Sequence, residues 1–62
     1  MFYIEIIKED LKTLVEQFGR TKQEAIVNAI NDLNGYFNCN CKTLNEVCKH
    51  FRVVEIRIKK ID

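Results

Sequence analysis

The clearest hydrophobic pattern in this chain lies within residues 19–35. Its apolar residues recur at positions i, i+3, i+4 and i+7, which places Ile26, Ala29, Ile30 and Leu33 on one face of a helix. Thr21 and Glu24 have the spacing of a capping box at the start of this helix. Gly35 offers the left-handed backbone that commonly ends a helix. The pattern therefore predicts one amphipathic helix whose apolar face packs on a core.

Two shorter segments show the same helical spacing. Residues 10–18 are predicted as a first helix that ends at Gly19, with apolar positions at Leu11, Leu14, Val15 and Phe18. A third helix is predicted to begin at a second capping box, with Thr43 as the cap and Glu46 three residues later. Its apolar positions are Leu44, Val47, Cys48 and Phe51. The middle of the chain is thus predicted to contain three helices, with a polar loop at residues 38–42 before the third.

The two ends of the chain alternate instead, as strands do. Residues 2–8 are rich in aromatic and β-branched residues, and Phe2, Ile4 and Ile6 share one face opposite Tyr3, Glu5 and Ile7. In residues 52–61 the inward face is predicted to hold Val54, Ile56 and Ile58, and the outward face Glu55, Arg57 and Lys59. If the two strands share a sheet, Glu5 and Arg57 are expected to form a cross-strand pair.

These elements predict a small α+β fold in the order β-α-α-α-β, with the helices packed on one face of a short sheet. The whole chain, residues 1–62, is predicted to be one domain. A chain of this length buries only about 60% of its unfolded surface, and a two-stranded sheet is poorly stable alone. We therefore expect dimerisation, with strands paired either within one chain or between two.

Charge, cysteine count and hydropathy narrow the class of protein. The formal net charge is +1. The one basic region is residues 52–60, which contain a single acidic residue, Glu55, and four basic residues: Arg52, Arg57, Lys59 and Lys60. Three cysteines are an odd number, which argues against a complete disulfide framework. The first residues lack the basic start of a signal peptide, and no apolar run approaches a membrane span. We therefore expect a cytoplasmic protein in a reducing compartment, with no membrane partner.

One cluster has metal-ligating chemistry. Cys39, Cys41, Cys48 and His50 supply four ligands of the kinds suited to tetrahedral zinc. Their spacing departs from the usual zinc patterns, and Cys48 and His50, two residues apart on a helix, point in different directions. We therefore favour buried and loop cysteines over zinc, and expect no cofactor. No glycine-rich phosphate loop, paired carboxylates or nucleophile signature is present, so we expect neither enzyme activity nor a small-molecule substrate.

Two groups of basic residues suggest nucleic acid. Arg20 and Lys22 flank Thr21 at the start of the central helix, where free backbone amides attract a phosphate. Arg57, Lys59 and Lys60, together with Tyr3, would give the outer face of the sheet a basic and partly aromatic character. A mixed, solvated surface explains the same residues, because Glu5 and Glu55 lie on that face, and this alternative stays open.

The order of elements in residues 2–35 resembles that of ribbon-helix-helix DNA-binding proteins. Those proteins have a short N-terminal strand, a helix, a turn and a second helix, and the segment GRTKQEAIVNAINDL is similar to the start of their second helix. The resemblance implies a homodimer whose paired N-terminal strands enter the major groove. It also implies that the amides of Thr21 and Lys22 hold phosphate. On this basis the sequence predicts a small DNA-binding transcription regulator.

A second class of function fits the same sequence. Short single-domain proteins without catalytic residues include inhibitors and adaptors of phages and other mobile elements, which act by binding another protein. Such a protein would use an exposed apolar or aromatic patch. The candidates for that patch are Tyr3, Ile7, Tyr36 and Phe37.

Overall fold

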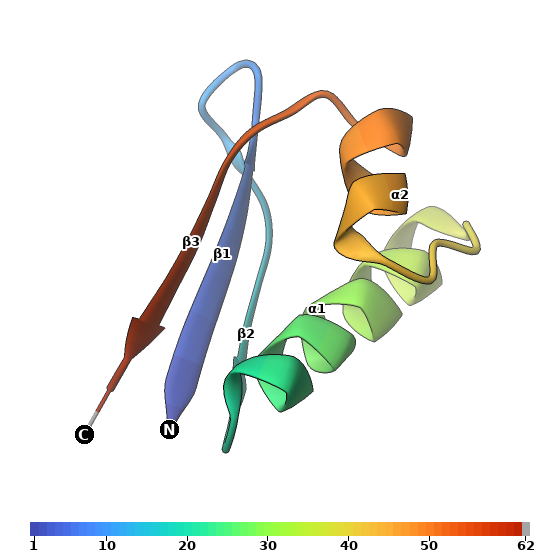
Figure 1. Ribbon diagram of the computed structural model, residues 1–62. Coiled ribbons are helices and arrows are strands. Elements are labelled where there is room, and N and C mark those ends of the chain that lie inside the picture. The colour runs from blue at the N-terminus through green and yellow to red at the C-terminus, as the bar shows by residue number, and fades with distance from the viewer. Residues whose placement is uncertain (62) are drawn as a thin grey trace.

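The computed structural model describes residues 1–61 of the chain. These residues form three strands and two helices: β1 (Phe2–Lys8), β2 (Thr13–Gly19), α1 (Lys22–Phe37), α2 (Leu44–His50) and β3 (Val53–Lys60). The strands make one antiparallel sheet in the order β2-β1-β3, and both helices lie on the same side of it (Figure 1). The α+β class is confirmed, but the observed order is β-β-α-α-β and not the predicted β-α-α-α-β.

The predicted first strand is confirmed as β1, and it occupies the centre of the sheet. Its even-numbered residues Ile4 and Ile6 are fully buried beneath the helices. β3 pairs with it along its length, with Ile58 opposite Ile4 and Arg57 opposite Glu5. The terminal strands therefore pair within one chain, and both edges of β1 are occupied.

The prediction of a helix at residues 10–18 is wrong, because most of this segment forms β2. A tight turn joins it to β1: the Lys8 carbonyl accepts the Leu11 N–H at 2.9 Å, and the Asp10 carboxylate accepts the Lys12 N–H at 3.1 Å. Leu11 adopts left-handed backbone with φ 63°, although no glycine marks the turn. A helix of about nine residues has little stability of its own, whereas pairing with β1 completes a three-stranded sheet.

The central helix is confirmed, but its end is not where the sequence predicts. The Thr21 hydroxyl accepts the Glu24 N–H at 3.0 Å, as in a capping box, and the Glu24 carboxylate accepts the N–H of Arg20, the residue before the cap, at 3.0 Å. The buried face holds Ala25, Ala29, Ile30 and Leu33, with Ile26 half-buried beside them. The helix continues through Gly35 and ends at Asn38, which takes the left-handed conformation with φ 53°. After glycine, asparagine is the residue most often found in this conformation at the end of a helix.

The predicted third helix is confirmed as α2, although one of its predicted core positions is wrong. Thr43 caps it by accepting the Glu46 N–H at 3.2 Å, and Val47 is fully buried. Cys48, predicted on the apolar face, is exposed. A helix of seven residues contacts the core through a narrow face, and Cys48 is turned about 100° from Val47.

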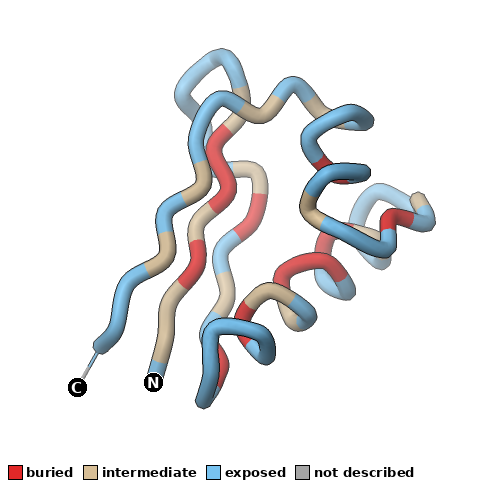
Figure 2. The backbone as a smooth tube through the Cα atoms, viewed as in Figure 1, coloured by how far each residue is buried: buried red, intermediate tan, exposed pale blue. Residues whose placement is uncertain are grey.

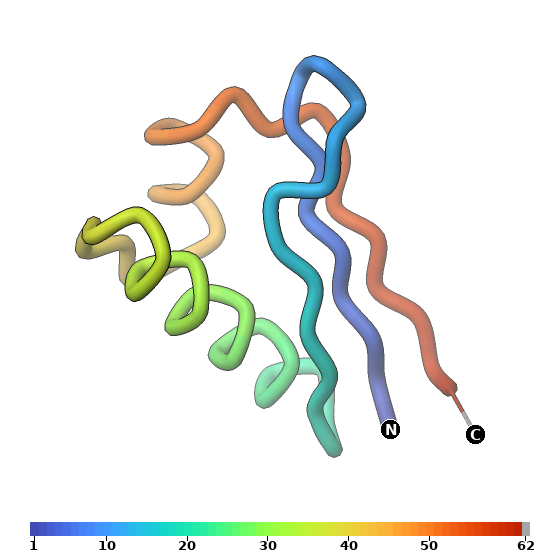
Figure 3. The backbone as a smooth tube through the Cα atoms, turned by 180° about the vertical axis from the view of Figure 1, so that it is seen from behind, coloured from blue at the N-terminus to red at the C-terminus, as the bar shows by residue number. Residues whose placement is uncertain are grey.

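The core lies between the sheet and the helices, where the buried segments of β1, β2, α1 and α2 face one another (Figure 2). From behind, β2 lies next to α1 and β3 lies at the far edge of the sheet (Figure 3). This position explains why Ile56 and Ile58 of β3, although they face inward, are only half-buried.

The predicted inward position of Val54 is also wrong. The pairing of β1 with β3 shifts at this point: Ile7 is opposite Glu55, but Lys8 is opposite Val53, so Val54 is an extra residue. Val53 packs against the core instead, and the Val54 side chain is 55% exposed. Such a bulge cannot be inferred from alternation alone. Neither helix of residues 1–61 has the length and apolar character needed to cross a bilayer.

Candidate nucleic-acid interface

The sheet has an outer face, turned away from the helices, whose side chains form three rows across the strands. The row nearest the N-terminal end of β1 contains Phe18, Tyr3 and Lys59; we call it the aromatic row. The second row contains three charged residues, Glu16, Glu5 and Arg57. The third contains Thr13, Ile7 and Glu55. The face is therefore aromatic and basic at one end and acidic along its middle.

The aromatic row presents two rings and a cation. The Tyr3 and Phe18 rings lie 5.2 Å apart, centroid to centroid, and the Lys59 ammonium lies 5.8 Å from the Tyr3 centroid, within cation–π range. Phe18 is 48% exposed. Phe18 is absent from the site residues predicted from the sequence, because the helix predicted for residues 10–18 places it on a buried face. Glu16 lies two positions before Phe18 and shares its face if the segment is a strand, so this charged neighbour was the signal that could have revealed the exposure of Phe18.

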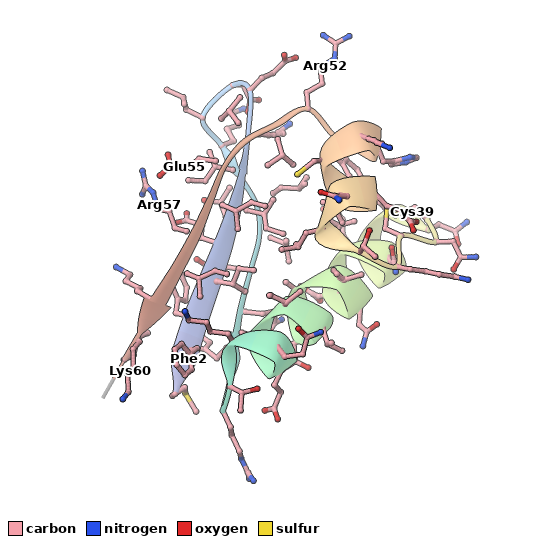
Figure 4. The ribbon with its side chains drawn as sticks, in the orientation of Figure 1. Phe2, Cys39, Arg52, Glu55, Arg57 and Lys60 are labelled. Atoms are coloured by element: carbon pink, nitrogen blue, oxygen red, sulfur yellow. The ribbon has the colours of Figure 1, made fainter. Side chains whose placement is uncertain are left out.

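Arg57 of the charged row pairs with one carboxylate of its own row and with one of the third row. The Arg57 guanidinium donates to the Glu55 carboxylate at 2.6 and 3.3 Å and lies 3.9 Å from Glu5, so the predicted Glu5–Arg57 pair is confirmed. Arg57 and Glu55 project together from β3, on the side away from the helices (Figure 4). This hydrogen bonding lowers the pKa of Glu55 and raises the pKa of Arg57. Arg57 is therefore engaged by carboxylates, which makes it a weaker phosphate ligand than an unpaired cation.

The other two carboxylates of this face accept hydroxyl hydrogen bonds. The Thr13 hydroxyl donates to Glu5 at 2.5 Å, and the Tyr3 hydroxyl donates to Glu16 at 2.6 Å. The hydrogen bond to Glu16, with smaller contributions from burial and from nearby carboxylate charge, raises the pKa of Tyr3 to about 12. Tyr3 therefore stays neutral at physiological pH, and its ring adds no negative charge beside the lysine.

Replacing Glu16 with glutamine should move the pKa of Tyr3 from about 12 back toward its ordinary value of 10.0. The pKa is raised in the folded chain, so the stabilisation is complete below the ordinary pKa and disappears as the pH rises through the folded one. Phenolate absorbance during a pH titration measures this in a Tyr36→Phe background, where Tyr3 is the sole tyrosine. A Tyr3 titration that is identical with and without Glu16 would show that this hydrogen bond does not control the phenol.

Basic residues gather at the same end of the sheet as the aromatic row. Phe2 is opposite Gly19 on one side and Lys60 on the other, so these three residues form a single row across the sheet. Adjacent strands are about 4.8 Å apart, which places the backbones of Gly19 and Lys60 roughly 10 Å from each other. Arg20, Thr21 and Lys22 follow Gly19 directly. Lys60 lies beside Phe2 at this end, opposite the end that carries Arg52 (Figure 4).

We define the basic end as Arg20, Thr21, Lys22, Lys59 and Lys60. All five are exposed, and none of the four cations forms an ion pair within residues 1–61. The one carboxylate of the first turn of α1, Glu24, is occupied by the Arg20 N–H. The amides of Lys22 and Gln23 precede the first hydrogen bond of the helix. The basic end thus combines four cations with free backbone donors.

Of the four candidate protein-docking residues, only Tyr36 and Phe37 lie together. Ile7 is 6% exposed, so its predicted place in a surface patch is wrong, and Tyr3 belongs to the aromatic row. Tyr36 and Phe37 lie at the last turn of α1, with ring centroids 4.8 Å apart. The Phe37 ring also lies 5.0 Å from the Phe51 ring, centroid to centroid. We call these three residues the aromatic end. It borders a groove lined also by Lys8, Lys12, Thr13 and Leu14.

Three of the four candidate zinc ligands line one cavity. Cys39, Cys41 and His50 surround it together with Asn40, Glu46 and Lys49, whereas Cys48 is exposed on α2 and does not line it. Across residues 1–61, no three or more His, Cys, Asp and Glu side chains are arranged to hold a metal ion. A four-ligand zinc shell of Cys39, Cys41, Cys48 and His50 is therefore not formed.

Comparison of the chain with protein-family models, with curated proteins and with solved structures finds no match.

Proposed function

We propose that this protein is a small, non-enzymatic DNA-binding regulator that holds the phosphate backbone at its basic end. The observation that supports this most is the sheet register, which brings two separate basic segments, residues 20–22 and 59–60, to the same end of the molecule. Phosphate neutralisation by lysine and arginine supplies most of the affinity in non-specific DNA binding. Four unpaired cations beside free helix amides fit that role.

The aromatic row favours single-stranded over double-stranded DNA. Unpaired bases stack on exposed aromatic side chains, and grooves for single strands combine such rings with cations. Phe18 and Tyr3 lie between Arg20 and Lys59 and offer this combination. The glutamates of the charged row would repel phosphate, so the proposed path crosses the end of the sheet and does not run along the strands.

This mode of binding differs from that of the ribbon-helix-helix proteins. Those proteins insert paired N-terminal strands from two chains into the major groove. Here β1 is flanked on both sides by strands of its own chain. The segment that corresponds to the first helix of those proteins is the strand β2 in this chain. A homodimer formed through the edge strands β2 and β3 stays a prediction.

The test is the salt dependence of binding to a labelled oligothymidine, measured by fluorescence anisotropy. Affinity should fall steeply between about 50 and 200 mM salt. The double variant Arg20→Ala/Lys22→Ala should reduce the slope of log affinity against log salt by about 1.4, since each phosphate contact on a single strand contributes about 0.7. The matched control is Lys12→Ala/Lys49→Ala, which removes the same charge from the β1–β2 turn at the other end of the sheet and from the last turn of α2, and should leave the slope unchanged. Equal slopes for both double variants would contradict the proposal.

Protein docking at the aromatic end is the second candidate. The observation that favours it is Tyr36, which is 83% exposed beside a groove containing two lysines and two further aromatic rings. Exposed aromatic residues are typical anchors of protein interfaces. This site is at the opposite end of the sheet from the basic end, so changes there should not affect DNA affinity.

A further inference from the structure

Cys39 and Cys41 are held together by one side chain of α1. The Asn34 amide oxygen accepts the Cys41 N–H at 2.9 Å and the Cys39 thiol at 3.3 Å, and its nitrogen donates to the Cys41 carbonyl at 2.7 Å. The Asn34 carbonyl also accepts the Cys39 N–H at 3.1 Å. A loop that follows a helix C-terminus is thereby fixed by four hydrogen bonds to a single half-buried asparagine.

This arrangement places two thiols side by side at one cavity. Both line it, with Lys49 and His50 of α2 at its other wall. Burial, and then the neighbouring Cys39 thiol, raise the pKa of Cys41, in agreement with two adjacent sulfurs. The third cysteine, Cys48, is exposed and lies outside the cavity. The chain therefore contains one preformed thiol pair and one separate thiol.

We infer that Cys39 and Cys41 form a two-thiolate site for monovalent copper. Zinc requires a shell of four ligands, which the described residues do not assemble. Copper(I) is a soft ion that selects thiolates, and it is stable with only two of them. On binding, each thiol releases its proton to solvent and each sulfur forms one bond to copper, whose oxidation state does not change. The resulting complex carries one negative charge. Lys49 and Glu46 both line the cavity, so their two side chains together add no net charge beside it.

The test is an anaerobic titration of the reduced chain with copper(I) in competition with bicinchoninate, a coloured copper(I) chelator. One copper should bind per chain. Cys39→Ser and Cys41→Ser should each lower the apparent affinity by at least about 100-fold, the upper end of the loss seen for outer-shell partners of a metal. Cys48→Ser is the matched control and should bind copper as the unaltered chain does. Added zinc(II) should not displace the copper.

Two results would overturn this inference. One is copper binding that survives the loss of both Cys39 and Cys41, and the other is an equal requirement for Cys48, which would indicate thiols shared between chains. Circular dichroism shows whether each variant is folded. If Cys41→Ser fails to fold, Cys39→Ser decides the outcome, because Cys39 is only half-buried.

Discussion

Gly19→Ala is expected to lower the free energy of unfolding by about 3 kcal/mol, the upper end of the usual cost of overpacking. A Cβ atom at this position would lie 2.3 Å from the backbone nitrogen of Ala25 and 2.7 Å from the carbonyl carbon of Glu24. Because these are backbone atoms, a side-chain rotation cannot relieve the clash. Urea denaturation followed by circular dichroism measures the loss. The first turn of α1 should also move away from β2, which would displace Arg20 and Lys22.

Gly35→Ala is the matched control for this prediction. A Cβ atom at Gly35 meets nothing within 4 Å, and the residue lies inside α1 without positive φ. Alanine there should raise the free energy of unfolding by about 0.5–1 kcal/mol, because glycine weakens a helix interior by that amount. If Gly19→Ala were tolerated as well as Gly35→Ala, the close packing of α1 on β2 would be wrong.

Phe18→Ala is expected to weaken binding to single-stranded DNA by about 1–3 kcal/mol, which is the contribution of one stacked base. That corresponds to a loss in affinity of roughly 5- to 150-fold at constant salt. The salt slope should not change, since no cation is removed. Anisotropy titrations at one salt concentration, together with the slope, separate this effect from loss of a phosphate contact.

Tyr36→Ala serves as the control for Phe18→Ala. It also removes an exposed aromatic ring, but from the aromatic end, and should leave DNA affinity unchanged. Loss of affinity in Tyr36→Ala, with none in Phe18→Ala, would move the proposed contact to the other end of the molecule. Phe18 is about half exposed, so its replacement should keep the chain folded.

The elements with strong local signals are those that the sequence predicts well. Thr21 and Thr43 are capping residues whose hydrogen bonds form within one helical turn, and both helices begin where these residues indicate. The β2 segment is predicted wrongly because Leu14, Val15 and Phe18 have the spacing of a helix, whereas the alternation of a strand is interrupted at Leu14, where the pairing with β1 shifts. The turn before it contains no glycine, and Leu11 adopts positive φ there. Only pairing with β1, which is a non-local contact, decides between the two.

The candidate site shows the same division between local and non-local information. The basic residues at the start of α1 and at the end of β3 are each evident in the sequence. Their meeting depends on Phe2, which pairs with both Gly19 and Lys60 once β2 is a strand. The exposure of Phe18 follows from the same change. The basic residues of the site could therefore be identified from the sequence, whereas Phe18 and the assembly of the site required the register of the sheet.

The most direct test of the proposed interface is an NMR titration of the ¹⁵N-labelled chain with oligothymidine. Amide shifts should concentrate in Phe2 and Tyr3, in residues 18–23 and in residues 58–60. Amides near Tyr36, Phe37 and Phe51 should remain in place. Shifts confined to those three residues, or no shifts at a DNA concentration that saturates anisotropy, would contradict binding at the basic end.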